Sequence, residues 1–247
     1  MNTPSILNRL LGAVFPNVCE FCGERRAGPE ESFICGTCRA IPNAIQRVRA
    51  PFCKVCGLEY EGAITTDFAC SNCSDLDLEF ESAQAAVHFK GLVKEVIHRY
   101  KYQRQEWYEP FLSELLIHAI LPDLKFNHAD LIAPIPLHRG KQHQRGFNQA
   151  ERLSARLALA ANVIHAPNLL VRVRPTEPQA SLDRARRQEN VKGAFKYAAE
   201  APLRGQKVLL VDDVLTTGVT ASACAKELRK NGAGKVRVWT VARGGLT

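Results

Sequence analysis

The stretch KVLLVDDVLTTGVTASACAKELRKNGA, Lys207 to Ala233, combines an apolar run, two adjacent carboxylates, a loop of threonines around a glycine, and a helical pattern. The run VLLV is apolar at every position, which is typical of a central strand in a parallel sheet that is covered on both faces. Asp212 and Asp213 follow at its carboxyl end. Ligands of such sheets bind beyond the carboxyl ends of the strands. The stretch therefore predicts both a fold class and the position of a site.

The loop after the two aspartates has the composition of a phosphate-binding turn. Gly218 allows the backbone to approach a ligand closely, and the first N–H groups of the following helix have no partner inside the helix. Hydroxyl donors come from Thr216, Thr217 and Thr220, and the apolar Val219 lies between Gly218 and Thr220 in the same loop. Two carboxylates beside such a cradle can accept hydrogen bonds from the vicinal hydroxyls of a ribose.

Three other interpretations of the loop explain its sequence less well than a phosphate-binding turn does. A G-x4-G-K-[ST] nucleotide-binding loop occurs nowhere in the chain, and the glycines of a dinucleotide-binding turn are missing. A plain acidic strand end with a threonine helix cap explains one aspartate and one threonine, but not the whole string.

From Ser82 onward, strand patterns alternate with helix patterns, which predicts a mostly parallel α/β sheet flanked by helices. Asn148 stands at the expected start of one helix as its cap. Strands are expected at 82–89, 129–136, 168–174, 207–213 and 235–243, and helices at 92–103, 108–121, 148–162 and 220–233 with an end at Gly232.

Eight of the nine cysteines form four C-x2-C pairs, and these pairs make two similar units. Twelve residues separate the pairs of the first unit and thirteen those of the second, which indicates an internal duplication. Each unit offers four thiolates at the spacing of a structural zinc ribbon and leaves no open position for catalysis. The predicted zinc ligands are Cys19, Cys22, Cys35 and Cys38 in the first unit and Cys53, Cys56, Cys70 and Cys73 in the second.

Zinc is favoured over two other uses of these cysteines. A disulfide framework needs an oxidising compartment, and a redox C-x-x-C normally occurs once, beside a βαβ unit. Sequential pairing inside each unit is the simplest arrangement, and a crossed arrangement stays open. Cys224 stands alone in a helical pattern, where we expect a buried apolar residue.

Composition limits the class of protein. The chain has 247 residues, a formal charge of +8 and a pI near 9.1, which mildly favours partners that carry phosphate. No apolar run approaches the length of a membrane span. The N-terminal segment SILNRLLGAVFP is expected to form a short amphipathic helix rather than a secretory signal. With the paired cysteines, this predicts a cytoplasmic protein without membrane insertion.

The string hhhhDDxxTTGxT at Val208–Thr220, with h apolar, resembles the binding sequence for 5-phosphoribosyl 1-pyrophosphate (PRPP) of type I phosphoribosyltransferases. Two further segments, Pro134–Ala158 and Gln179–Phe195, are similar to characteristic segments of the ComF family, also labelled GntX or amidophosphoribosyltransferase-like. That family joins an N-terminal double zinc ribbon to a phosphoribosyltransferase-like domain. The resemblance covers nearly the whole chain, and implies a ribbon region over 1–80 and a phosphoribosyltransferase-like domain over 81–247.

The resemblance also implies roles for particular residues. Asp212 and Asp213 would meet the ribose hydroxyls of PRPP with Mg²⁺ nearby, and the loop from Thr216 to Thr220, with Val219 where alanine is more usual, would hold the 5-phosphate. The segment Ser181–Lys192 would correspond to a mobile lid. The pyrophosphate would face Pro136, Leu137, His138, Arg139 and Arg145.

Two functions remain open from the sequence. An enzyme would transfer phosphoribosyl from PRPP to an unidentified base or amine of nucleotide metabolism; no catalytic residue is assigned. A binding module would sense PRPP or a related ribose phosphate and engage single-stranded DNA, with competence-machinery proteins as partners, as the ComF resemblance implies for natural competence. Basic residues exceed the needs of one PRPP molecule, which favours a separate DNA surface; its predicted members are Lys141, Arg184, Arg186 and Arg187. Lys101 is a candidate to reach the PRPP site from a helix end.

Overall fold

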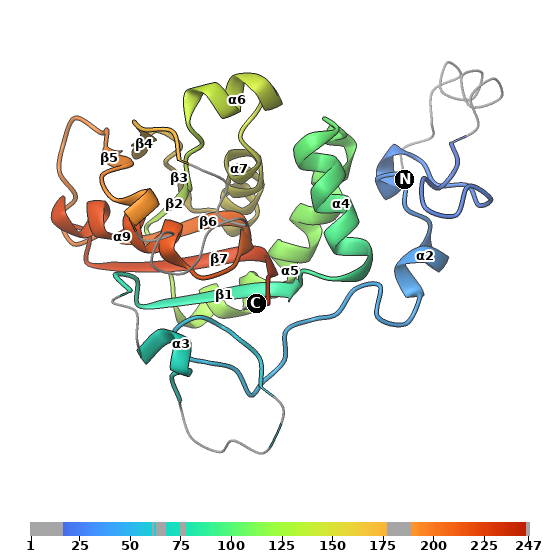
Figure 1. The fold of residues 1–247 in the computed structure, drawn as a ribbon, viewed down its shortest axis with the longest axis horizontal. Coiled ribbons are helices and arrows are strands. Elements are labelled where there is room, and N and C mark those ends of the chain that lie inside the picture. The colour runs from blue at the N-terminus through green and yellow to red at the C-terminus, as the bar shows by residue number, and fades with distance from the viewer. Residues whose placement is uncertain (1–16, 61, 63–67, 75–77, 177–188, 246–247) are drawn as a thin grey trace.

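The computed structural model describes residues 17–245, except 61, 63–67, 75–77 and 177–188. Its centre is a five-stranded parallel sheet in the order β1-β7-β6-β2-β3 (Figure 1). The parallel α/β architecture predicted from the sequence is confirmed. The strands are β1 (Ser82–His88), β2 (Leu131–Pro134), β3 (Ile164–His165), β6 (Lys207–Leu215) and β7 (Lys235–Arg243).

The central strand β6 is longer than the predicted 207–213, because it continues past both aspartates to Leu215. Its neighbour β2 ends at Pro134, which pairs with Val211, while β7 continues alongside β6 to the pair Leu215–Arg243. Proline has no N–H to donate to a further ladder bond, so it is a natural end for β2. The two aspartates thus lie just past the last β2–β6 pair, with β6 still held by β7 on its other side.

Helices cover both faces of the sheet, and the alternation of side chains along β6 explains how. Leu209 and Val211 belong to one apolar core and Val208 and Leu210 to the other. The first core is shared with α4 (Gly91–Tyr102), α5 (Glu109–Phe126) and α7 (Gln149–Ala161), and the second with α9 (Val219–Lys230). A buried central strand needs an apolar residue at every position for this reason.

Several local expectations are confirmed at residue level. The Asn148 side-chain oxygen accepts a hydrogen bond from the N–H of Ala150 at 3.1 Å and caps α7. Cys224 is fully buried in α9. Helix α9 ends at Lys230, and Gly232 follows with φ +93°, in the left-handed region that favours glycine.

One predicted strand lies outside the main sheet. The segment 168–174 forms only β4 (Leu170–Arg172), which pairs antiparallel with β5 (Phe195–Tyr197) in a separate two-stranded sheet. The fifth strand of the main sheet is instead β3, which has two residues and which the sequence analysis did not predict. A strand this short carries no periodicity, so only its pairing with β2 identifies it.

The two cysteine units lie at different places on the sheet domain (Figure 1). The first, with the short helices η1 (Pro29–Glu31) and α2 (Gly36–Ala40), shares the core of α4 and α5; Ile34 is fully buried there. The η2 turn (Glu106–Tyr108) contributes Tyr108, whose hydroxyl donates to Glu20 at 2.6 Å. The second unit, with α3 (Ser71–Ser74), lies along the edge strand β1.

The connection between the units covers the free edge of the sheet. The N–H of Val48 donates to the carbonyl of Ala86 at 3.3 Å, and the N–H of His88 donates to the carbonyl of Gln46 at 2.7 Å. An unpaired edge strand is a template for aggregation, and this segment blocks it. The amphipathic helix predicted at the N-terminus lies outside the described residues.

Candidate zinc units and ribose-phosphate site

Each cysteine unit gathers its four sulfur atoms within 4.8 Å of one another. The shortest separations are 3.7 Å (Cys19 to Cys38) in the first unit and 3.5 Å (Cys70 to Cys73) in the second. A tetrahedral ion with Zn–S bonds of about 2.3 Å has sulfur–sulfur edges of about 3.8 Å, so both units fit zinc. The ligands pair within each unit, as the simplest sequence interpretation predicted, and not across units.

Backbone N–H groups aim at the sulfur atoms and favour thiolates. The N–H of Cys35 donates to the sulfur of Cys19 at 3.4 Å, and that of Cys70 to the sulfur of Cys53 at 3.2 Å. Burial raises the pKa of Cys19, but these N–H donors outweigh it and lower the pKa to about 6. The same balance lowers the pKa of Cys53 to about 7. Burial and the neighbouring cysteines raise the pKa of Cys38 to about 12 and also raise that of Cys73, so the surroundings favour the thiolate at one ligand of each unit more than at another. Thiolates are the form that binds zinc.

The two aspartates of β6 differ in their surroundings. Asp213 is buried and forms an ion pair with Lys101 of α4, with Oδ1 and Nζ 2.8 Å apart. Asp212 Oδ1 accepts a hydrogen bond from the N–H of Asp213 at 2.8 Å. Burial and the neighbouring Asp213 carboxylate raise the pKa of Asp212 to about 7, although Lys101 opposes the shift. A ligand that brings hydroxyl donors or a cation to Asp212 would favour its charged form.

The threonine loop joins β6 to α9. Gly218 caps α9 with φ +81°, and a Cβ there would lie 3.2 Å from the ring of Phe80, so glycine is required on two counts. Thr216 is exposed, whereas Thr217 is buried with a hydroxyl that has no partner among the described residues. Val219 is buried as the first residue of α9. Thr216, Gly218 and Thr220 line a small cavity of about 70 Å³ that also contacts Asp212.

A larger cavity of about 180 Å³ opens beside the aspartates, and cations line its other walls. They come from separate elements: Lys101 from α4, Lys141 and Arg145 from α6 (Arg139–Arg145), and Arg172 from β4. Burial, followed by the nearby charges of Arg172 and Arg145, lowers the pKa of Lys141. Cations held this close together are suited to binding an anion. The lining also includes Asp212, Asp213 and Thr220, with Pro136, Leu137, Asn148 and Gln149.

The basic segment after β2 forms the helix α6, which was not among the helices expected from the sequence. His138 caps α6, with Nδ1 accepting from the N–H of Gly140 at 3.2 Å. The helix separates the predicted pyrophosphate residues: Pro136, Leu137 and Arg145 line the cavity, whereas Arg139 is exposed and neither it nor His138 is among the lining residues.

Lys141, which the sequence analysis assigned to a DNA surface, lies in the cavity wall and donates to the carbonyl of Thr176 at 3.3 Å. Arg184, Arg186 and Arg187, and most of the predicted lid, lie outside the described residues.

Three lining residues were not singled out from the sequence as ligand contacts. Arg172 ends a short strand and hydrogen-bonds to Thr176. Asn148 donates to the carbonyl of Ile135 at 3.3 Å. Gln149 is buried, and its Nε2 has no hydrogen-bond partner among the described residues. The sequence offered one clue, which concerns Asn148 at the helix cap and Gln149 in the first helical turn. Polar residues at such positions are seldom fully buried, so burial of both would indicate a use other than solvation.

Comparisons with known proteins agree with this geometry. A family model described as a double zinc ribbon domain matches residues 10–74, and one described as a phosphoribosyl transferase domain matches residues 144–246. Competence protein F of Haemophilus influenzae is 34% identical over 200 residues, which cover 78% of this chain and 85% of that protein. The chain belongs to the ComF family.

More distant ComF-family relatives align over similar lengths. DNA utilization protein YhgH of Escherichia coli is 29% identical over 213 residues, which cover 85% of this chain and 90% of that protein. Competence protein ComFC of Bacillus subtilis is 26% identical over 227 residues, which cover 87% of this chain and 85% of that protein.

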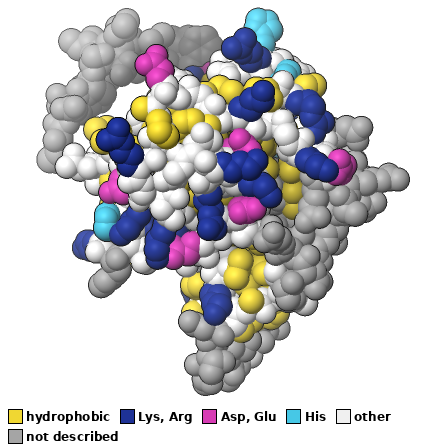
Figure 2. Space-filling model, turned by 90° about the vertical axis from the view of Figure 1, so that its left-hand side faces the viewer, with side chains coloured by type: hydrophobic (Ala, Val, Ile, Leu, Met, Phe, Trp, Pro, Cys, Tyr) yellow, Lys and Arg dark blue, Asp and Glu magenta, His cyan; other side chains and the backbone are white. Residues whose placement is uncertain are grey.

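Charges of both signs lie on the face of this ComF-family chain that Figure 2 shows. On the face drawn in Figure 2, Lys and Arg side chains are interspersed with Asp and Glu side chains. Ion pairs among the described residues include Lys230 with Glu227 at 3.1 Å and Lys235 with Glu81 at 2.5 Å. None of the helices in the described part of the chain has the length and apolar character that crossing a bilayer requires.

Proposed function

We propose that this ComF-family protein binds PRPP with Mg²⁺ between β6, the threonine loop and α6. One observation carries the proposal. Asp212 and Asp213 lie beside the threonine loop and face a cavity of about 180 Å³ whose other walls hold four cations. Carboxylates at one side and cations at the other suit a sugar whose hydroxyls lie between phosphate groups.

Each part of the ligand has a proposed contact. The ribose hydroxyls donate to Asp212 and Asp213, and the 5-phosphate lies against Thr216, Thr217, Gly218, Val219 and Thr220 at the start of α9. The pyrophosphate meets Lys141, Arg145 and Arg172, whose charges converge on the cavity. The carboxylates of Asp212 and Asp213, together with phosphate oxygens of the ligand, would hold Mg²⁺, which would offset the charge of the phosphates.

Calorimetric titration of the full chain with PRPP and Mg²⁺ tests the proposal. Asp212→Asn combined with Asp213→Asn removes two charge-assisted hydrogen bonds, each worth about 1.5–3 kcal/mol, so we expect the affinity to fall by a factor of hundreds. Glu227→Gln, a change at a half-buried position of α9 that removes an ion pair with Lys230, is the matched control. Equal affinity of the folded double variant and the control would locate the site elsewhere.

Turnover decides between a binding module and an enzyme. The same protein is incubated with PRPP, Mg²⁺ and a panel of nucleobases and amines, and pyrophosphate release is measured. Release with one acceptor would make the protein an active phosphoribosyltransferase of nucleotide metabolism, whereas tight binding without release favours a module.

The relatives' names support a second function, in the use of DNA. We propose that the protein acts in the cytoplasm in natural competence and binds single-stranded DNA during import, together with competence-machinery proteins, with Arg184, Arg186 and Arg187 as DNA contacts. Because phosphate contacts release counterions, the affinity should fall steeply with salt and depend little on base sequence.

A filter-binding titration across salt concentrations tests the DNA proposal. Reversing the charges of Arg186 and Arg187 should weaken binding and flatten the salt slope. The Asp212 and Asp213 variant separates this function from the first, because it should lose PRPP and keep DNA. Absence of DNA binding even at low salt would refute the second function and leave the first intact.

A further inference from the structure

Arg243, the last residue of β7, is a cation buried between the second cysteine unit and the threonine loop. Its side chain is almost fully inaccessible, since the residue is 2% exposed. On one side Nε donates to the carbonyl of Cys56 at 3.1 Å, and Nη2 lies 3.6 Å from the Cys56 sulfur. On the other side Nη1 donates to the carbonyls of Leu215 at 3.0 Å and Thr216 at 2.5 Å. One guanidinium therefore joins a metal ligand to the first residues of the phosphate loop.

The charge of Arg243 needs compensation, because a buried unpaired cation is costly. Among the described residues, its hydrogen bonds go to carbonyl oxygens and the Cys56 sulfur, and no carboxylate forms an ion pair with it. A zinc ion with four thiolates carries a formal charge of about −2. The loaded second unit thus supplies the negative charge that Arg243 otherwise lacks.

The end of β7 also fixes the loop through its backbone. The N–H of Gly244 donates to the carbonyl of Leu215 at 2.8 Å, and a Cβ on Gly244 would lie 3.1 Å from Cγ2 of Thr216. Leu215 and Thr216 therefore contact the Arg243–Gly244 pair closely, and a displacement of Arg243 moves the start of the loop.

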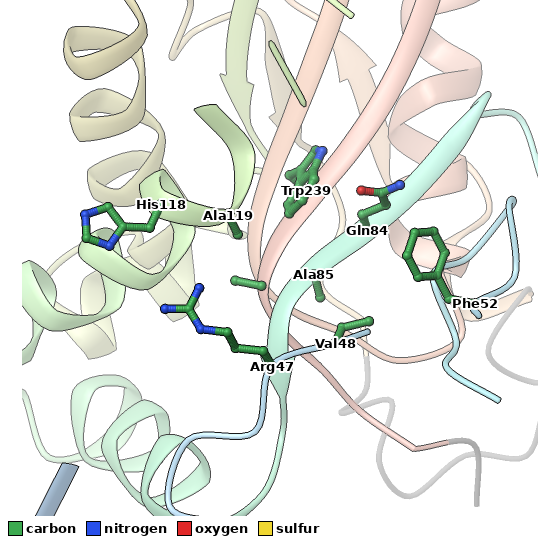
Figure 3. A pocket seen from close by; sticks show the side chains of 10 residues that line it. Arg47, Val48, Phe52, Gln84, Ala85, His118, Ala119 and Trp239 are labelled. Atoms are coloured by element: carbon green, nitrogen blue, oxygen red, sulfur yellow. The ribbon is translucent and has the colours of Figure 1, made fainter. Parts of the chain in front are cut away.

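Arg243 is one of several attachments of the second unit to the sheet, and the ion pair between Glu59 and His88 of β1, 2.8 Å apart, is another. The N–H of Ala83 donates to the carbonyl of Val55 at 2.7 Å, and Gly57 packs against the same part of β1. Next to these contacts the interface is hollow: a cavity of about 320 Å³ lies between β1, α5 and the connection from the first unit (Figure 3). Phe52, Gln84 and Trp239 line this cavity (Figure 3).

The first unit offers a natural comparison. It contacts α4 and the η2 turn, where Glu20 pairs with Arg99 at 3.6 Å and accepts from Tyr108. Within the described residues, no hydrogen bond links its cysteines to the threonine loop. The two units have the same C-x2-C pairs, so they differ mainly in the elements that they contact: α4 and the η2 turn for the first unit, and the threonine loop through Arg243 for the second.

We propose that Arg243 is a positioning residue that transmits the metal state of the second unit to the phosphate loop. With zinc bound, the guanidinium is compensated and holds Leu215 and Thr216; without zinc, it reorganises and the loop loosens, so anion affinity falls. The predicted fall in anion affinity rests on the proposed PRPP function. By thermodynamic linkage, an anion in the loop must in turn raise the zinc affinity of the second unit.

Hydrogen exchange of the full chain without ligand tests the mechanism independently of PRPP. Cys56→Ser and Cys22→Ser are matched, because each removes the second cysteine of its unit. We expect roughly ten- to hundredfold faster exchange of amides 214–220 in Cys56→Ser, from the loss of hydrogen bonds to a charged group. Cys22→Ser should also lose one zinc but raise exchange only near its own unit. Equal loop exchange in the two variants would overturn the proposal.

Arg243→Gln keeps the proposal testable if a cysteine variant does not fold. It should retain two zinc ions yet show the faster loop exchange, and Arg243→Lys should restore part of the protection because it keeps the charge. In cobalt-substituted protein, Arg243→Gln should shift the thiolate charge-transfer bands of one site, which a purely structural loss would leave in place. Unchanged loop exchange and unchanged spectra in Arg243→Gln would refute the link.

Zinc release to a chromogenic chelator completes the test in the unmodified protein. At equilibrium with the chelator, PRPP with Mg²⁺ should increase the retention of one of the two ions and leave the other unaffected. Binding of PRPP with equal release of both ions refutes the coupling alone, whereas absence of PRPP binding refutes the proposed function and leaves the exchange result to decide the coupling.

Discussion

Replacing Lys101 with methionine should expose how strongly the aspartate pair depends on a cation from another helix. The Lys101 Nζ lies 2.8 Å from Asp213 Oδ1, and the two side chains are only 19% and 6% exposed. Removing one partner of a buried ion pair costs about 3–5 kcal/mol, because the other charge is left uncompensated. Lys101 retains some contact with solvent, so we expect the lower end, about 3 kcal/mol at pH 8.

The cost should shrink as the pH falls. The pKa of Asp212 is already raised to about 7 by burial and by Asp213, and Lys101 is the group that opposes the rise. Without Lys101 the carboxylates take up a proton more readily. In the Lys101→Met variant, each pH unit below the pKa of its aspartate pair then restores roughly 1.4 kcal/mol of the lost free energy of unfolding, until the pair holds one proton. The variant should thus differ least from the wild type near pH 5–6.

Urea unfolding of Lys101→Met, Asp213→Asn and the double variant, each at pH 6 and pH 8, measures the coupling between the two residues. Lys94→Met is the control, because Lys94 lies on the same helix and is exposed. The midpoint should shift at constant slope for Lys101→Met and stay near the wild-type value for Lys94→Met. A coupling energy within about 0.5 kcal/mol of zero at pH 8, or equal losses at both pH values, would contradict the argument.

Three further predictions concern the metal, the pH dependence and the loop. Protein purified under reducing conditions should contain two zinc ions per chain by elemental analysis, consistent with its two units of four cysteines, and Cys22→Ser should contain one; a single ion in the wild type would overturn the two-unit assignment. Because the folded pKa of Asp212 is raised to about 7 from an ordinary value of 3.8, its contribution to stability should fall as the pH rises from about 4 to 7 and then level off. Asp212→Asn should remove that part of the slope in urea titrations, and an unchanged slope would contradict the burial of the carboxyl. Gly218→Ala should destabilise the protein by about 1–2 kcal/mol more than Gly146→Ala, since both have positive φ but only Gly218 has Phe80 in the path of a Cβ. Equal midpoints of the two alanine variants would show that Phe80 moves aside freely.

Local patterns in the sequence were sufficient to predict the features that depend on residues close together in the chain. Four cysteines at C-x2-C spacing predict a tetrahedral site because two short turns bring all the ligands together, and the structure places the sulfur atoms accordingly. The apolar run before Asp212 predicts a central strand because only a doubly covered strand is apolar at every position. The threonine loop follows from the same stretch, since a strand, a turn and a helix start are all set within a few residues.

Tertiary structure decided what distant residues contribute. The cations that face Asp212 and Asp213 come from α4, α6 and β4, and no pattern in the sequence states that these elements converge on one cavity. Lys141 shows the consequence, because its charge suits a DNA surface equally well until α6 is placed beside β6. Arg243 shows it again: an arginine at the end of an apolar strand looks like a solvent-exposed terminus, yet the second cysteine unit folds back over it and buries it. Spacing along the chain fixes contacts inside a turn or a helix, whereas contacts between elements depend on the packing of the whole core.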